Sequence, residues 1–172
     1  MIRRLLLAVT LPMTLAAAPS GAMTVEDAPL ATLVAEADAV LRAFVVATEA
    51  VPDPRAPGSA RLWTRVTLAI AEVDTAPEAL ALADTFTLLL PGGASATHRT
   101  VVPGVPTLLP GDEVVALLAL RNHRWQPLGY HLGLLFVDAA GDLWRAGPRG
   151  RPATRLRPRD AAALPATLTG AR

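Results

Sequence analysis

The residues that could bind a metal ion or act as an acid-base pair are few and far apart in this chain. They are His98, His123, His131, Asp112, Glu113 and Asp138. The histidines lack the H-E-x-x-H spacing of a helical zinc site. Asp112 and Glu113 are adjacent, and adjacent strand residues point to opposite faces, so the two carboxylates would not converge on a glycosidic bond. The sequence predicts no metal ligands, although a metal-dependent hydrolase stays open as an alternative if the histidines converge.

Nucleophilic catalysis has equally little support. After residue 22 the only serines are Ser59 and Ser95, and neither lies in a G-x-S-x-G elbow. His98 follows Ser95 by three residues, but closeness in sequence does not produce the geometry of a catalytic triad. The chain has no cysteine, which removes thiolate nucleophiles and cysteine zinc sites. We therefore predict no catalytic residues, no cofactor and no enzymatic activity.

A binding surface is the stronger hypothesis from residue spacing. Arg61, Trp63 and Arg65 follow each other at i, i+2 and i+4, so on a strand their side chains share one face. An indole flanked by two guanidinium groups can stack on a base, a sugar or a partner's arginine. The structural alternative is that Trp63 packs beneath neighbouring loops.

The first 22 residues have the pattern of a secretory signal peptide. Arg3 and Arg4 precede a mainly apolar stretch of fourteen residues, 5–18, and Ser20, Gly21 and Ala22 supply the small residues of a cleavage site. An uncleaved membrane anchor is the alternative, but the apolar run is short for one, and no later segment reaches the ~20 apolar residues of a membrane span. We expect a periplasmic or secreted protein without a transmembrane segment after cleavage.

Charge divides the remaining chain into two parts. Residues 23–138 contain 7 Arg and 13 Asp or Glu, whereas residues 139–172 contain 7 Arg and 2 Asp. The asymmetry predicts an Arg/Pro-rich tail over 147–172, partly disordered or with a short helix, that could bind the acidic body, a partner or an anionic surface. Its candidate binding residues are Arg149, Arg151, Arg155 and Arg157. The acidic body and the expected export argue against nucleic acid and favour an unknown protein partner.

The pattern of hydrophobic residues predicts a β-rich domain over 23–146, which precedes the Arg/Pro-rich tail. A short helix is predicted within 27–38. Strands are predicted over 39–51, 61–74, 84–90 and 113–121, with a short edge strand at 98–102 and a hairpin formed by 132–138 and 143–145. The run 114–120 lacks alternation, which indicates a strand covered on both faces, with a helix as the competing interpretation.

Several of these segments together resemble a known group. They are ADAVLRAFVVA (37–47), PGG (91–93), VPGVPTLLPGDEVVALL (102–118) and GYHLGLLFV (129–137). This combination resembles uncharacterised exported bacterial proteins with a PGG turn and a VxGxPxFxxGE pattern. Through the strand pattern these are similar to the OB-like barrel of tissue inhibitors of metalloproteinases and netrin modules. Arg42 and Ala43 stand near the group's Gly, and Leu109 near its aromatic. The inhibitors' N-terminal Cys has no counterpart, because Met23 is the predicted first residue.

The resemblance implies a mainly β fold, a small antiparallel and partly open OB-like barrel of five to seven strands, with one short N-terminal helix and a flexible C-terminal tail. The expected function is that of an exported non-enzymatic binding module for another protein, such as an exported enzyme. The alternative is a periplasmic ligand-binding or nucleic-acid-binding module that uses Arg61, Trp63 and Arg65.

Overall fold

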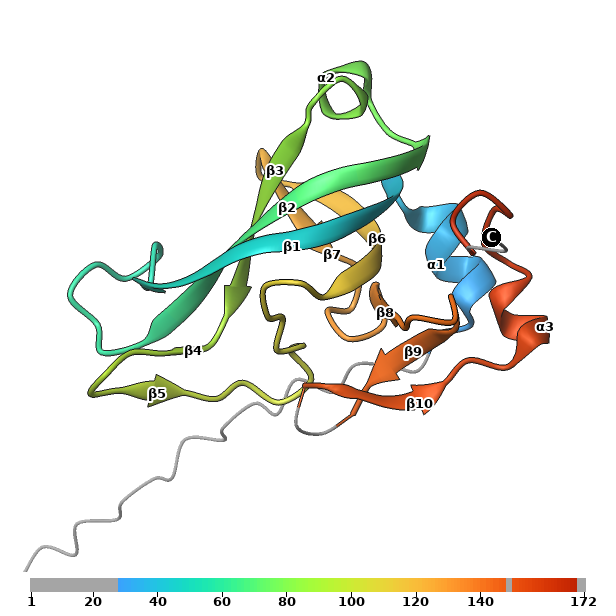
Figure 1. Cartoon of the computed structure of the whole chain (residues 1–172). Helices are drawn as coiled ribbons and strands as arrows, with labels where there is room; N and C mark the ends of the chain where they lie inside the picture. Colours follow the sequence, from blue (N-terminus) through green and yellow to red (C-terminus); the bar gives the residue numbers. More distant parts are fainter. Residues whose placement is uncertain (1–27, 148–149, 170–172) are drawn as a thin grey trace, which may run out of the picture.

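The computed structural model describes residues 28–147 and 150–169, and its regular elements are mainly strands (Figure 1). The predicted signal peptide and Arg149 lie outside the described residues. The elements are α1 (Leu30–Glu36), β1 (Ala39–Pro52), β2 (Leu62–Thr75), α2 (Glu78–Ala81), β3 (Thr85–Pro91), β4 (Gly93–Ala94), β5 (Arg99–Thr100), β6 (Glu113–Arg121), β7 (Arg124–Pro127), β8 (Leu134–Val137), β9 (Leu143–Ala146), β10 (Pro152–Arg155) and α3 (Pro158–Ala161). Among the described helices, none has the length and apolar character needed to cross a membrane.

The strands form one antiparallel sheet of eight strands and a separate two-stranded ribbon. The order in the large sheet is β10-β9-β8-β6-β1-β2-β3, and β4 pairs with β5 in the ribbon. Strand β6 has two neighbours along the same edge: its first half pairs with β8 and its second half with β7. This arrangement confirms the predicted mainly β, antiparallel fold with short helices.

Strand β6 lies at the centre of the molecule and explains the unbroken apolar run in the sequence. Val114, Ala116 and Leu118 belong to one core cluster, whereas Val115 and Leu117 belong to a second cluster on the opposite face. Successive side chains of a strand alternate between faces. Because both faces are covered, the run has no polar positions, and the strand interpretation of 114–120 is confirmed over the helical one.

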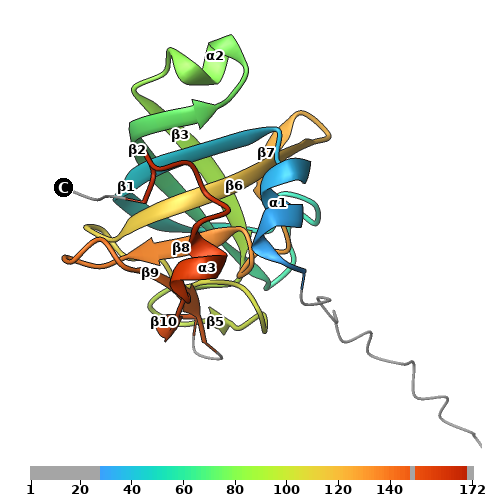
Figure 2. The same cartoon turned by 90° about the vertical axis from the view of Figure 1, so that its right-hand side faces the viewer.

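The second core cluster is closed by elements from the two ends of the described chain. Helix α1 contributes Leu30 and Leu33, and the C-terminal segment contributes Leu164 and Leu168. Figure 2 shows α1 and α3 over the same side of the sheet, in front of β6 and β8. The two helices also lie within contact distance of each other. This cluster gives the far C-terminal residues a defined place in the fold.

The C-terminal segment, expected to be partly disordered or to form a short helix, contains regular elements and buried side chains. Within residues 150–169, β10 pairs with β9, α3 forms a short helix, and Leu168 is fully buried. The high Arg and Pro content predicted disorder, but the segment also carries leucines that complete the second core cluster. The expected short helix is therefore present, and the rest of the described segment packs on the body.

Strand β7 was not predicted, because its turn lacks the usual glycine. Arg121 pairs with Arg124, which leaves Asn122 and His123 as a two-residue loop. Both have positive φ, 50° and 59°, the conformation of a type I′ hairpin turn, in which Asn-Gly is the favoured pair. His123 occupies the position usually taken by Gly, so the sequence gives no clear signal for this hairpin.

The hairpin of β8 and β9 was predicted and is present. Asp138 stabilises its turn by accepting hydrogen bonds from the backbone N–H groups of Ala140 and Asp142, each at 2.9 Å. The indole N–H of Trp144 donates to the other carboxylate oxygen, also at 2.9 Å. The Trp144 hydrogen bond, followed by the backbone bond from Asp142, lowers the pKa of Asp138 below its usual value.

Candidate functional site

The residues of the predicted Arg-Trp-Arg surface do not form an open platform. Trp63 is only 9% exposed, and the guanidinium carbon of Arg55 lies 5.0 Å from its ring centroid. Arg65 pairs with Glu49 across the strands at 2.8 Å, and Arg61 is exposed. The indole is thus covered by the loop between β1 and β2, and it presents little ring face for stacking on a ligand.

The arginines of the C-terminal segment are engaged with acids of the same chain. Arg151 makes two hydrogen bonds to the carboxylate of Asp112 and a third, of 3.0 Å, to the carbonyl oxygen of Thr107. Arg155 pairs with Asp142. The hydrogen bond to Asp112 raises the pKa of Arg151. Of these contacts, the one between Arg151 and Asp112 joins the segment to the acidic part of the chain.

Asp160 binds a further arginine of this segment. Arg157 donates from Nε to the Asp160 carboxylate at 2.7 Å, and this hydrogen bond is the main cause that lowers the pKa of Asp160. Together with Arg151 and Arg155, Arg157 therefore already has an anionic partner. These contacts leave the segment with less free positive charge than its composition indicates.

The side chains of the candidate catalytic residues do not converge on one site, and several of these residues lie in turns. The Ser95 hydroxyl accepts a backbone hydrogen bond from His98 N at 3.0 Å, whereas the His98 imidazole contacts the hydroxyl of Thr97. His123 is in the β6–β7 turn, and His131 lies beside Gly104. Across 28–147 and 150–169 no group of three or more His, Asp or Glu could hold a metal ion. Asp112 and Glu113 are each paired with an arginine, Arg151 and Arg42.

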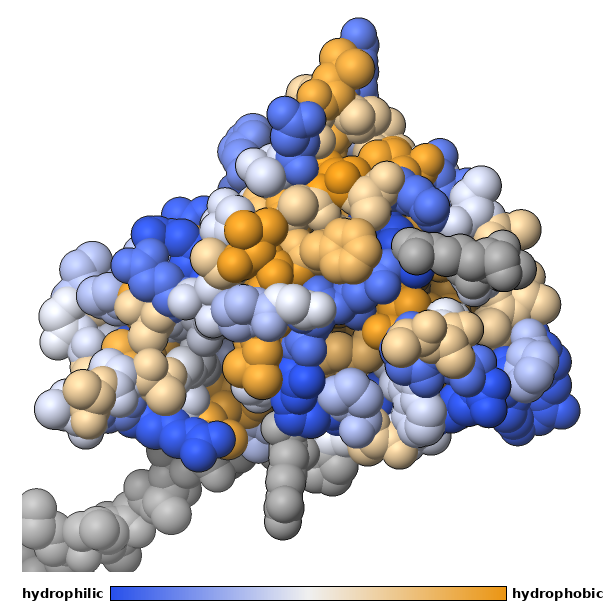
Figure 3. Space-filling view, in the orientation of Figure 1, coloured by the Kyte–Doolittle hydropathy of each residue, from blue (hydrophilic) through white to orange (hydrophobic). Residues whose placement is uncertain are grey.

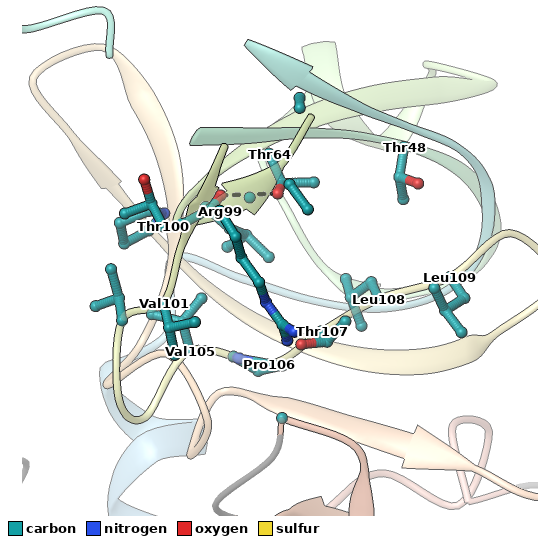
Figure 4. A pocket seen from close by; sticks show the side chains of 18 of the residues that line it. Thr48, Thr64, Arg99, Thr100, Val101, Val105, Pro106, Thr107, Leu108 and Leu109 are labelled. Carbon is teal, nitrogen blue, oxygen red and sulfur yellow. Dashed lines mark hydrogen bonds between the residues drawn. The ribbon is translucent and has the colours of Figure 1, made fainter. Parts of the chain in front are cut away.

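The candidate site is a cavity of about 620 Å³ between β1, the β4–β5 ribbon and residues 105–109 (Figure 4). Its volume is within the range of about 300–1,000 Å³ found for ligand pockets. Apolar and polar side chains are mixed around it. The lining includes Thr48, Leu90, Arg99, Val101, Val105 and Leu108.

One wall of the cavity is an unpaired edge of β1. On this edge β1 pairs with β6 only as far as Phe44, and Val45 then exchanges 2.8 Å hydrogen bonds with Gly111 N and Asp112 O. The pairing of β1 with β2 continues to Pro52. From Thr48 onwards, β2 is the only described strand that pairs with β1, so the other edge of β1 is unpaired beside the cavity.

The phase of the β1–β2 ladder shows which backbone groups point to this edge. Asp53 N donates to Arg61 O at 3.1 Å, so these opposed residues form a hydrogen-bonded pair. Bonded and non-bonded pairs alternate along an antiparallel ladder. Val51 and Glu49 therefore bond to β2, whereas Thr48 and Ala50 direct their N–H and C=O groups away from it. Both residues line the cavity and are half-buried.

Arg99 is the only cationic side chain of the described cavity lining. Figure 4 shows it extending across the opening from β5 toward Thr107. Within the described residues no carboxylate lies in ion-pair range of it, and the one acid of the lining, Glu49, is taken by Arg65. The cavity thus combines apolar walls, an open strand edge and one free guanidinium group.

The opposite wall is held in place by the C-terminal segment. Thr107 N donates to Gly150 O at 2.7 Å, and Arg151 binds the carbonyl oxygen of Thr107. Gly150 has φ +73°, and a Cβ atom there would lie 2.6 Å from Thr107 Oγ1. Only glycine satisfies both conditions, so Gly150 fixes the position of residues 105–109.

Exposed apolar side chains lie next to the cavity. Phe44, Val46 and Leu109 are 39%, 55% and 47% exposed. The hydrogen bonds between Val45 and residues 111–112 bring the end of the 105–109 wall beside β1. Figure 3 shows hydrophobic residues gathered over β1 in the middle of this face. Such a patch beside an open edge is typical of a protein-binding surface.

Sequence reasoning did not identify this site. Residues 91–109 were interpreted as turns and a short edge strand, because Gly and Pro dominate them. These residues fold around the cavity through close contacts with other strands. One such contact is at Gly93, where an added Cβ atom would lie 3.1 Å from Thr64 Oγ1. The one available signal was Arg99, a single charge between the Gly/Pro turns.

Comparison with known proteins finds no relative of this chain. No family model, no curated protein and no solved structure matches the chain.

Proposed function

We propose that this protein is an exported, non-enzymatic binding module that takes an extended segment of a partner protein into the cavity beside β1. The observation that carries the proposal is the pair of unpaired backbone positions, Thr48 and Ala50, on the cavity-facing edge of β1. An added strand would pair there at the usual spacing of about 4.8 Å. Recognition of an extended peptide by strand addition obtains affinity from main-chain hydrogen bonds.

The energetics favour an occupant that brings its own backbone. Thr48 and Ala50 together offer two N–H and two C=O groups, and each hydrogen bond formed there contributes about 0.5–1.5 kcal/mol net. Soluble proteins normally protect sheet edges with charged side chains, prolines or covering loops. Here Glu49, between the two positions, is bound to Arg65, Pro52 ends β1, and Val46 is an exposed apolar side chain, so the unprotected stretch is limited to Thr48 and Ala50. An edge with this character suits a protein partner.

The proposal includes a partly open, OB-like barrel as the finer description of the fold. Strands β3 and β7 have Cα atoms within 8 Å of each other without being paired, which supports a sheet that curls toward closure. In such a barrel the cavity lies where the wall between β1 and residues 105–109 is incomplete. A bound segment would fill this gap as an additional strand.

The alternative surface around Arg61, Trp63 and Arg65 has less support. Stacking on a base or sugar requires an exposed ring face, and Trp63 is covered by Arg55. Arg65 would also have to leave Glu49 to bind an anion. The cavity beside β1 requires neither change, and it is therefore the preferred site.

The test uses a phage-displayed library of random 12-residue peptides selected against residues 23–172. Selected peptides should slow hydrogen exchange at the amides of Thr48 and Ala50. The variant Ala50→Pro should weaken peptide binding by about two- to tenfold, because it removes one edge N–H donor at a position where proline is compatible with an edge strand. Ala50→Ser, which keeps the N–H, should bind as the parent protein does.

Two results would contradict strand addition. The first is a set of peptides that bind without protecting Thr48 and Ala50. The second is an Ala50→Pro variant that keeps its circular dichroism spectrum and its peptide affinity.

A further inference from the structure

We propose that the bound segment carries a carboxylate and that Arg99 recognises it. This inference rests on the proposed function, because it specifies the chemistry of the segment that pairs with β1. The carboxylate can be an Asp or Glu side chain or the C-terminus of the partner. Arg99 would thereby determine which extended segments bind, whereas the backbone edge of Thr48 and Ala50 accepts any sequence.

The charges around the cavity lead to this assignment. Arg99 and Glu49 are the two ionised side chains in the lining, and Glu49 forms its 2.8 Å ion pair with Arg65 outside it. The other cations near this wall are also occupied: Arg151 binds Asp112, and Arg55 covers the ring of Trp63. The guanidinium group of Arg99 is left as the one uncompensated charge facing the cavity.

The position of Arg99 suits an anion on a bound strand. Arg99 pairs with Ala94 in the β4–β5 ribbon, and its side chain crosses the cavity opening (Figure 4). A guanidinium group can donate two parallel hydrogen bonds to one carboxylate, and such charge-assisted bonds are stronger than neutral ones. A strand paired with β1 would present its alternate side chains to the same space.

The remaining lining defines what should accompany the carboxylate. Leu90 and Leu108 are buried at 1% and 3% exposure, and Val101 is 69% exposed at the rim. These side chains form an apolar surface next to Arg99. The preferred occupant is therefore an extended segment that combines apolar side chains with one acidic group, and a segment with a basic group at that position is disfavoured by repulsion from Arg99.

The experiment measures the affinity of a selected 12-residue peptide in matched forms against the protein and two variants. Replacing the acidic residue by its amide, or amidating the C-terminus, identifies which carboxylate is bound. The loss should be at least about tenfold for the form that removes it, the effect of a hydrogen bond to a charged group. Arg99→Glu should reverse the preference toward a peptide with Arg in place of the acid. Arg121→Glu, at an exposed site on β6 outside the cavity lining, is the control for net charge.

The outcomes separate this inference from the proposed function. Peptides that protect Thr48 and Ala50, lack any enriched acid and bind Arg99→Glu as tightly as the parent would overturn the role of Arg99 and leave strand addition standing. If no library peptide protects Thr48 and Ala50, strand addition fails, and the recognition of a carboxylate there fails with it.

Discussion

At the scale of single residues, the ion pair of Arg42 and Glu113 is the most unusual feature of the core. Arg42 lies on β1 with 5% exposure, and its Nε donates to a carboxylate oxygen of Glu113 on β6. Burying one charge is costly, but a hydrogen-bonded opposite charge offsets much of the cost. The two residues are 71 positions apart, so the sequence shows an isolated Arg in a strand and gives no sign of its partner.

Removing one member of this pair is predicted to be more harmful than removing both. Arg42→Met should lower the free energy of unfolding by about 3 kcal/mol, because Glu113, whose side chain is only 17% exposed, is left without its opposite charge. The double variant Arg42→Met/Glu113→Leu should recover most of that loss. Urea unfolding at pH 7 measures both, with the exposed Arg61→Met as the control. A single variant within about 0.5 kcal/mol of the parent would show that the pair is solvated in the folded state.

At the scale of elements, the wall formed by residues 105–109 depends on a backbone conformation in another segment. Gly150 has a positive φ and approaches Thr107 so closely that a side chain has no room. Gly58 also has a positive φ, +90°, but nothing lies within 4 Å of its Cβ position. Substitutions at these two glycines therefore distinguish the cost of a side chain at positive φ from the cost of a steric contact.

Gly150→Ala is predicted to destabilise the protein more than Gly58→Ala. Both introduce a side chain at positive φ, which costs about 1 kcal/mol. Only Gly150→Ala adds a contact of 2.6 Å with Thr107 Oγ1, so the 105–109 wall must also move. We expect its loss of unfolding free energy to exceed that of Gly58→Ala by at least about 1 kcal/mol. Equal losses, measured by urea unfolding, would show that residues 105–109 adapt without cost.

The elements also show which parts of the fold the sequence could predict. Strand β6 was predicted with its observed bounds, because a continuous apolar run between turn residues is a local signal. Strand β7 was missed because its turn uses His123 where glycine is usual. The cavity was missed for a different reason: the free edge at Thr48 and Ala50 follows from where β6 stops pairing with β1, and no local pattern encodes that end point.

At the scale of the whole molecule, the second core cluster joins sequence-distant segments. Leu30 and Leu33 of α1, Leu135 of β8 and the C-terminal Leu164 and Leu168 share it. Composition alone predicted a flexible tail, because Arg and Pro are abundant after residue 147. This segment has three leucines among many charges, which is a weak signal in the sequence. The leucines stabilise the segment only because the sheet offers them an apolar surface.

Leu168→Ala is predicted to lower the free energy of unfolding by about 2–5 kcal/mol, the range for truncating a buried leucine. Leu168 is fully buried, whereas Leu82 is 76% exposed, so Leu82→Ala is a matched control that should change stability by less than about 0.5 kcal/mol. Thermal unfolding followed by circular dichroism compares the two. A Leu168→Ala variant as stable as the control would mean that the C-terminal segment is not part of the cooperative fold in solution.

The packing of α1 against the C-terminal segment determines when this protein can finish folding. Its second core cluster needs Leu30 near one end of the described chain and Leu168 near the other. A growing chain cannot complete the cluster until Leu168 has been added, and non-local contacts of this kind form slowly. During synthesis the nascent chain should therefore expose the apolar face of β6 and stay a substrate for holding chaperones. The second core cluster can form only after Leu168 has been released.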